Sequence, residues 1–158
     1  RELAALKTRH RNALKQRQPI ENEDAAFTDP EEQFRWDVTC AWARRIPAGE
    51  KAAAPLGNYE LGPDFLASLE RIHGISRAKI IDVVVEVLTG KVESNSGREL
   101  HPLRIGSAGG AETVRRGDAT CWRVSLQVNT PSARRLHFWR SADGVELSRV
   151  VLHDDFTP

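Results

Sequence analysis

Residues 121–128 alternate strictly between apolar and polar side chains, which is the clearest pattern in the sequence. Successive side chains of a β-strand point to opposite faces, so a period of two indicates a half-buried strand. The apolar set is Trp122, Val124, Leu126 and Val128. The set that we expect to face solvent is Cys121, Arg123, Ser125 and Gln127. The pattern predicts a sheet with one face on a core and one open face.

Residues 134–156, RRLHFWRSADGVELSRVVLHDDF, contain two apolar-rich runs around an Ala-Asp-Gly tripeptide, which is typical of a β-hairpin. In the first run, the alternation directs Leu136 and Phe138 to the core. The side chains that it leaves on the open face are Arg135, His137 and Trp139.

The second run of this hairpin, residues 145–153, fits two registers. One register exposes Glu146 and Ser148, and the other exposes Arg149 and His153. An extra residue in a strand re-aims the side chains that follow it. We therefore expect a β-bulge near residues 149–153 that turns His153 to the open face.

Helical signals dominate the chain before residue 90. Residues 30–45 begin after Asp29, a good N-cap, and their apolar stripe consists of Phe34, Val38 and Trp42. Residues 63–73 and 76–89 follow the same plan and are separated only by Gly74 and Ile75, which predicts a tight αα-hairpin.

A helical pair followed by strands and tight turns predicts an α+β fold, with the helical hairpin on the apolar face of a small antiparallel β-sheet. The stretch PAGEKAAAPLG predicts a boundary between an N-terminal helical extension with its linker, residues 1–57, and an α+β domain, residues 58–158. Residues 1–18 are rich in helix formers and predict a basic helix. We expect the extension to enlarge the core; an alternative is that its acidic residues cover the basic sheet face.

The formal net charge is only +1, but charge is segregated along the chain. Residues 1–19 carry six Lys or Arg and one acidic residue, residues 20–89 carry seven basic and thirteen acidic residues, and residues 90–152 carry ten basic and six acidic residues. Basic ends around an acidic middle fit either a polyanionic partner or an acidic segment folded onto a basic surface.

Several classes of protein do not fit this composition. No apolar run approaches the ~20 residues that span a bilayer, so we expect a cytoplasmic protein without a membrane partner. Cys40 and Cys121 do not form a disulfide framework, and neither has a Cys or His nearby at metal-ligand spacing. We expect neither a metal nor a cofactor.

The predicted open face combines guanidiniums, imidazoles and an aromatic ring. Guanidiniums match phosphate oxygens, aromatic rings stack on unpaired bases, and imidazoles transfer protons near neutral pH. These are the parts needed to bind RNA and to cleave it through its own 2′-hydroxyl group. Polar residues are also ordinary on the exposed face of a sheet, so a purely structural role stays open at this stage.

The order of elements and the segments HPLR, CWRVSL, RRLHFW and VVLHDDF resemble the RelE/ParE superfamily of bacterial toxins, over roughly residues 58–156. The resemblance implies an mRNA endoribonuclease that needs no metal, with ribosome dependence left open, and a cognate antitoxin or other protein partner. It implies catalytic roles for Arg123, Arg135, His153 and, less directly, Glu146 or Asp154. It implies nucleic-acid binding by Arg104, Arg115, Arg116, His137, Trp139 and Arg149.

The sequence departs from the family in three ways. Arg115 and Arg116 replace the usual Lys-rich run, no Tyr lies near the C-terminus, and two Asp residues follow His153. One alternative is a non-enzymatic module that binds nucleic acid or protein through the same face, as gyrase poisons of the superfamily do. Another is a metal nuclease that uses His137, His153 and the two Asp residues.

Overall fold

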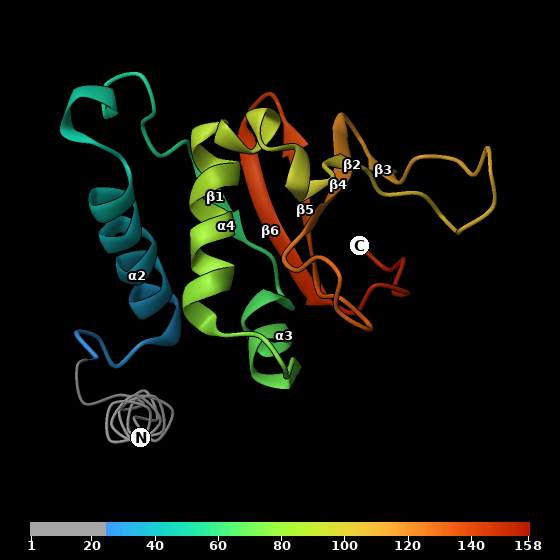
Figure 1. Ribbon diagram of the computed structural model, residues 1–158, viewed down its shortest axis with the longest axis horizontal. Helices are drawn as coiled ribbons and strands as arrows, with labels where there is room; N and C mark the ends of the chain where they lie inside the picture. Colours follow the sequence, from blue (N-terminus) through green and yellow to red (C-terminus); the bar gives the residue numbers. More distant parts are fainter. Residues whose placement is uncertain (1–24) are drawn as a thin grey trace, which may run out of the picture.

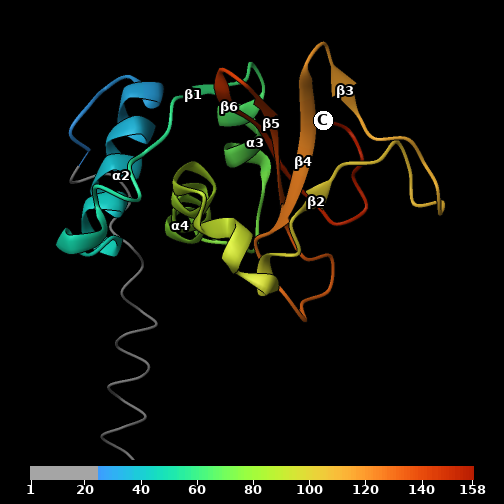
Figure 2. The same cartoon turned by 90° about the horizontal axis from the view of Figure 1, so that it is seen from above.

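The protein has an α+β fold with three helices and a mixed sheet of six strands in the described residues, 25–158 of the computed structural model. The helices are α2 (Pro30–Arg45), α3 (Phe65–Arg71) and α4 (Arg77–Thr89). The elements form layers: α2 lies outside α4, and α3 and α4 cover one face of the sheet (Figures 1 and 2). The basic helix expected over residues 1–18 lies outside the described residues.

The strands are β1 (Tyr59–Leu61), β2 (His101–Pro102), β3 (Arg115–Arg116), β4 (Ala119–Ser125), β5 (Arg135–Ser141) and β6 (Gly144–Val151). Their order is β1-β6-β5-β4-β2, and β3 pairs with β4. Strand β1 runs parallel to β6 while the other pairs are antiparallel, so the expectation of a purely antiparallel sheet is wrong at this edge. No hairpin turn links β1 to β6, so nothing forces them to run in opposite directions.

The helix boundaries follow the local signals in the sequence. The Asp29 carboxylate accepts a hydrogen bond from the Glu32 N–H at 2.9 Å, and the Ser76 hydroxyl accepts one from the Lys79 N–H at 3.2 Å. Gly90 ends α4 with φ 76°, a left-handed conformation that costs glycine little. Three of the predicted boundaries thus have a direct physical cause.

A single hydrophobic core joins all three helices to the sheet. Phe34 and Val38 of α2 are fully buried in the same cluster as Val124 of β4. The rings of Phe34 and Phe65 meet edge to face, 5.1 Å between centroids. Residues 47–57, which the sequence marks as a linker, therefore connect two parts of one core, as expected for an extension that enlarges it.

We expect Phe34→Ala to lower the free energy of unfolding by about 3–5 kcal/mol, because it removes a fully buried aromatic ring. Trp36→Ala is the matched control, since Trp36 lies on the same helix but is 47% exposed. Urea unfolding followed by circular dichroism measures both. A Phe34 variant as stable as the Trp36 variant would show that α2 is not part of the core.

Candidate functional site

The sheet face away from the helices carries a regular grid of side chains, which we call the distal face. Pairing aligns Cys121 with Trp139 and Glu146, Arg123 with His137 and Arg149, and Ser125 with Arg135 and Val151. His101 of β2 pairs with Arg123 and extends the middle row. The middle row is therefore His101, Arg123, His137 and Arg149, across four strands.

A β-bulge at Ser148 sets the grid on β6. His137 pairs with Arg149 and Phe138 pairs with Leu147, which leaves Ser148 as the extra residue. The bulge therefore places both Glu146 and Arg149 on the distal face, although they are three residues apart. The expected bulge is present, one residue before the predicted segment. Because of it, Glu146 from one predicted register and Arg149 from the other both lie on the distal face.

The distal face is not open to solvent, and that prediction is wrong. Arg123 is 5% exposed, Arg135 7%, His137 0% and Trp139 7%. The C-terminal tail, which we define as residues 152–158, lies on this side of the sheet, opposite the helices (Figure 2). The expected face is correct for these side chains, but their exposure depends on a segment that follows the hairpin.

The tail offers mostly hydrogen-bond acceptors to the distal face. Arg123 donates through Nη2 to the His153 carbonyl oxygen. His137 Nδ1 lies 2.8 Å from the Thr157 carbonyl oxygen, which Arg149 also contacts at 3.3 Å. Arg149 forms an ion pair of 3.1 Å with the Asp155 carboxylate. Two carbonyl groups and one carboxylate thus replace water over the middle row of the grid.

His137 is neutral at pH 7. A carbonyl oxygen can only accept, so Nδ1 carries the proton, and the lone pair of Nε2 is buried without a partner in the described residues. Burial lowers the pKa of His137 to about 4, and the Arg123 and Arg149 charges act in the same direction, while Thr157 and Asp155 oppose them. As positioned here, His137 is a poor proton donor.

Two of the predicted catalytic residues meet at one end of the distal face. Arg135 and His153 line a pocket of about 520 Å³ together with Glu99, Gln127 and the loop 128–133. Arg135 donates to the Gln127 carbonyl at 3.1 Å and approaches the Glu99 carboxylate at 3.5 Å. Arg123 is linked to this pocket through the backbone of His153. We call this the Arg135 pocket.

Glu99 is the residue of this pocket that the sequence did not reveal. Its carboxylate accepts a 2.6 Å hydrogen bond from Ser125, which lowers the pKa of Glu99 against an opposing effect of burial, and Arg135 lowers it further. Its backbone is left-handed, with φ 48°, which is uncommon for a residue other than glycine and often marks a functional position. The loop SGREL gives no pattern that predicts this placement.

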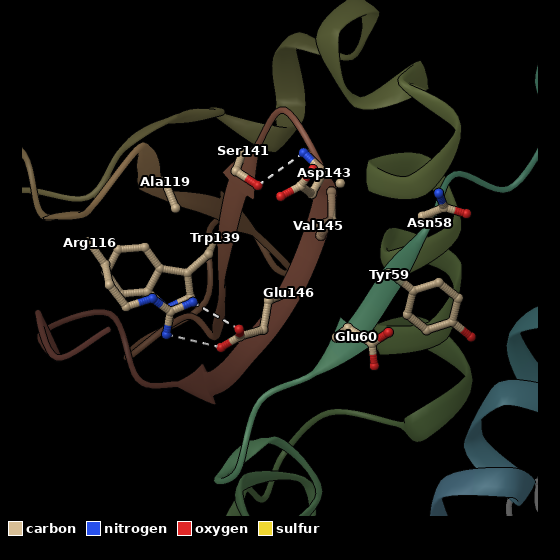
Figure 3. A pocket seen from close by; sticks show the side chains of 11 residues that line it. Asn58, Tyr59, Glu60, Arg116, Ala119, Trp139, Ser141, Asp143, Val145 and Glu146 are labelled. Carbon is tan, nitrogen blue, oxygen red and sulfur yellow. Dashed lines mark hydrogen bonds and ion pairs between the residues drawn. The ribbon is translucent and has the colours of Figure 1, made fainter.

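Glu146 lies apart from the Arg135 pocket, in a second pocket of about 200 Å³. Figure 3 shows Arg116 between the Trp139 ring and the Glu146 carboxylate. The Arg116 guanidinium lies 4.4 Å from the Trp139 ring centroid and donates two hydrogen bonds to Glu146, at 2.8 and 3.3 Å. Three predicted site residues meet here, and the carboxylate is already paired with a cation.

The remaining predicted binding residues lie at the edge of the sheet. Arg104 is exposed and donates to the Ala111 carbonyl at 3.0 Å within the long loop before β3. Arg115 is exposed on β3. The structure therefore divides ten of the predicted residues among the Arg135 pocket, the covered middle row, the Glu146 pocket and this edge.

The described residues offer no metal centre, and the buried Cys121 is not a reactive thiol. Within residues 25–158, no group of three His, Cys, Asp or Glu side chains could hold one ion. The metal-nuclease alternative, which uses His137, His153 and the two Asp residues, is therefore not supported by a cluster of ligands in the described residues. Burial raises the pKa of Cys121 to about 12, so this thiol stays protonated at neutral pH.

The comparisons with known proteins add no relative to this picture. No family model, curated protein or solved structure matches the chain. Over residues 25–158, no helix combines the length and the apolar character that crossing a membrane requires. Function is therefore inferred from the geometry of the site.

We expect His137 to make the folded protein less stable in mild acid. Its pKa of about 4 in the folded state lies below the ordinary value of 6.5, so the unfolded chain takes up the proton first. The contribution of neutral His137 to the free energy of unfolding is complete above pH 6.5 and is lost as the pH falls towards 4. The loss amounts to roughly 3 kcal/mol.

Urea unfolding at a series of pH values measures this effect. His137→Gln should flatten the dependence on pH relative to the wild type, and His73→Gln, at an exposed position, should not. The lowered pKa of Asp155 acts in the same direction, so the difference between variants is the relevant quantity. An unchanged slope in the His137 variant would contradict the assignment.

Proposed function

We propose that this protein is a RelE-like endoribonuclease that cleaves messenger RNA through the 2′-hydroxyl of the substrate, without a metal ion. The observation that supports this most is the Arg135 pocket, where a guanidinium, a carboxylate and an imidazole line one cavity. As for other toxins of this kind, we propose a cytoplasmic site of action and a cognate antitoxin or other protein partner. The helical pair against a sheet with an antiparallel C-terminal meander is consistent with this assignment.

Each group of the pocket has a role in this reaction. In the proposed reaction the Glu99 carboxylate, which lies 3.5 Å from Arg135, accepts the proton of the 2′-hydroxyl. The 2′-oxygen then attacks phosphorus while the bond from phosphorus to the 5′-oxygen breaks, which gives a 2′,3′-cyclic phosphate and a 5′-hydroxyl. Arg135 stabilises the negative charge on the phosphoryl oxygens.

His153 is placed to complete the proton transfers. Its side chain is 52% exposed at the rim of the pocket, and imidazole groups often serve as general acids in enzymes. In the proposed reaction it donates a proton to the departing 5′-oxygen. Asp154 lies 3.0 Å from its Nδ1 atom and would stabilise the protonated ring.

One observation favours the non-enzymatic alternative. Glu146 is paired with Arg116 in a different pocket, so it cannot serve as a second carboxylate beside Arg135. A module that binds RNA without cleaving it would need the guanidiniums of the distal face but neither Glu99 nor His153.

Glu99→Gln separates the two functions, because the amide keeps the size of the side chain and cannot act as a base. We expect cleavage of single-stranded RNA to fall by at least about 100-fold, with binding retained. Gel analysis of RNA ends in the presence of EDTA measures cleavage, and fluorescence anisotropy measures binding. Glu70→Gln, an exposed position on α3, is the matched control.

The substrate provides a second control. RNA that carries a 2′-deoxy sugar at the cut position should resist cleavage. Binding by the wild type without any cleavage of ordinary or ribosome-bound RNA would overturn the enzymatic proposal in favour of the binding module. Loss of cleavage with EDTA would contradict the proposed metal-independent mechanism.

A further inference from the structure

The middle row of the distal face has more positive charge than its contacts neutralise. Arg123 is buried and Arg149 is half-buried, while Asp155 is the carboxylate that forms an ion pair with this row in the described residues. Among residues 25–158, the groups that Arg123 contacts are a backbone carbonyl and the ring of Phe156, 5.5 Å from its guanidinium. A buried guanidinium without a full negative partner favours an incoming anion.

Two buried polar atoms of this row have no hydrogen-bond partner in the described residues. They are the Arg123 Nε–H donor, which an anion could satisfy, and His137 Nε2, whose lone pair an anion could not satisfy. Such atoms are rare in proteins because each costs free energy when it is removed from water. The tail thus covers the row but satisfies it only in part.

The tail is attached in a way that allows it to leave. Strand β6 ends at Val151, and the tail adds no strand to the sheet. Its own turn is closed by a hydrogen bond of 3.1 Å from the Asp155 N–H to the Leu152 carbonyl. Displacing it would leave the pairing of all six strands intact.

A single aromatic side chain anchors the tail. Phe156 is half-buried and packs on a small cluster separate from the main core, formed by Leu103, Ala119, Cys121 and Trp139. The tail is therefore held by one apolar anchor, one ion pair and a few hydrogen bonds to carbonyl groups.

We infer that the C-terminal tail is an internal substitute for an RNA backbone. It covers the phosphate-binding row of Arg123, His137 and Arg149, and RNA reaches this row only by displacing residues 155–158, while His153 keeps its contact with Arg123 and its place in the Arg135 pocket. The carbonyl and carboxylate oxygens of the tail stand where the non-bridging oxygens of a phosphodiester would accept the same donors. This inference rests on the proposed function and extends it by a second binding row beside the Arg135 pocket and by its regulation.

Phe156→Ala tests the inference without changing any charge. We expect the variant to bind single-stranded RNA about tenfold more tightly than the wild type, because the burial of one aromatic ring no longer opposes displacement. The probe is a short fluorescein-labelled RNA with 2′-O-methyl sugars, which cannot be cleaved, and fluorescence anisotropy gives Kd. Phe27→Ala is the control: it removes an exposed ring that lies far from the tail in the sequence, and it should leave Kd unchanged.

Asp155→Asn is a second variant, with which the inference can still be tested if the loss of Phe156 prevents folding. It removes the ion pair with Arg149 and should tighten binding about threefold. Asp64→Asn, an exposed position before α3, makes the same change in net charge and should have no effect.

Modification of His137 by diethyl pyrocarbonate reports directly on the tail. In the wild type, His137 should be protected because it is fully buried, while the exposed His73 reacts. In the tail variants, His137 should become reactive, and the RNA probe should protect it again. Peptide mass spectrometry distinguishes the two positions.

The outcomes separate the inference from the function on which it depends. If the wild type binds RNA and the tail variants bind no more tightly than their controls, the tail does not compete and the inference alone is wrong. If neither the wild type nor any tail variant binds RNA, the proposed function is wrong and the inference falls with it. Tighter binding together with newly reactive His137 would support both.

Discussion

Buried guanidinium groups are the constraint on which the rest of the site depends. Charge removed from water is tolerated only where acceptors replace the solvent. On the distal face, the Glu99 carboxylate lies beside Arg135, and the tail folds back over Arg123 and Arg149. The left-handed backbone of Glu99 and the course of the tail both place oxygen atoms next to cations.

The helices, and the face of the sheet to which each strand side chain points, could be predicted because their causes are local. Asp29, Ser76 and Gly90 act on the helix turn next to them, and each works as its residue type indicates. The alternation of apolar and polar residues in β5 identified the face of Arg135 and His137, since side-chain direction follows from the strand alone. Local rules decide these features, whatever lies elsewhere in the chain.

The exposure of the same side chains could not be predicted, because it depends on contacts between distant segments. The tail covers His137 from twenty residues further along the chain, and Glu99 reaches Arg135 from thirty-six residues before it. Neither the alternation in β5 nor the composition of the tail encodes this meeting. Val128, expected on the buried face, is 55% exposed for a related reason, since β4 ends at Ser125 before the pattern does.

The bulge at Ser148 decides which face of the sheet each later side chain of β6 occupies. If Ser148 paired regularly with His137 instead of forming the bulge, each side chain from Arg149 onwards would move to the opposite face. Arg149 would then point to the hydrophobic core, and Val150, now buried there, would lie beside Arg135. The bulge thus determines that the chain leaves the sheet with its cations and its covering segment on the same side.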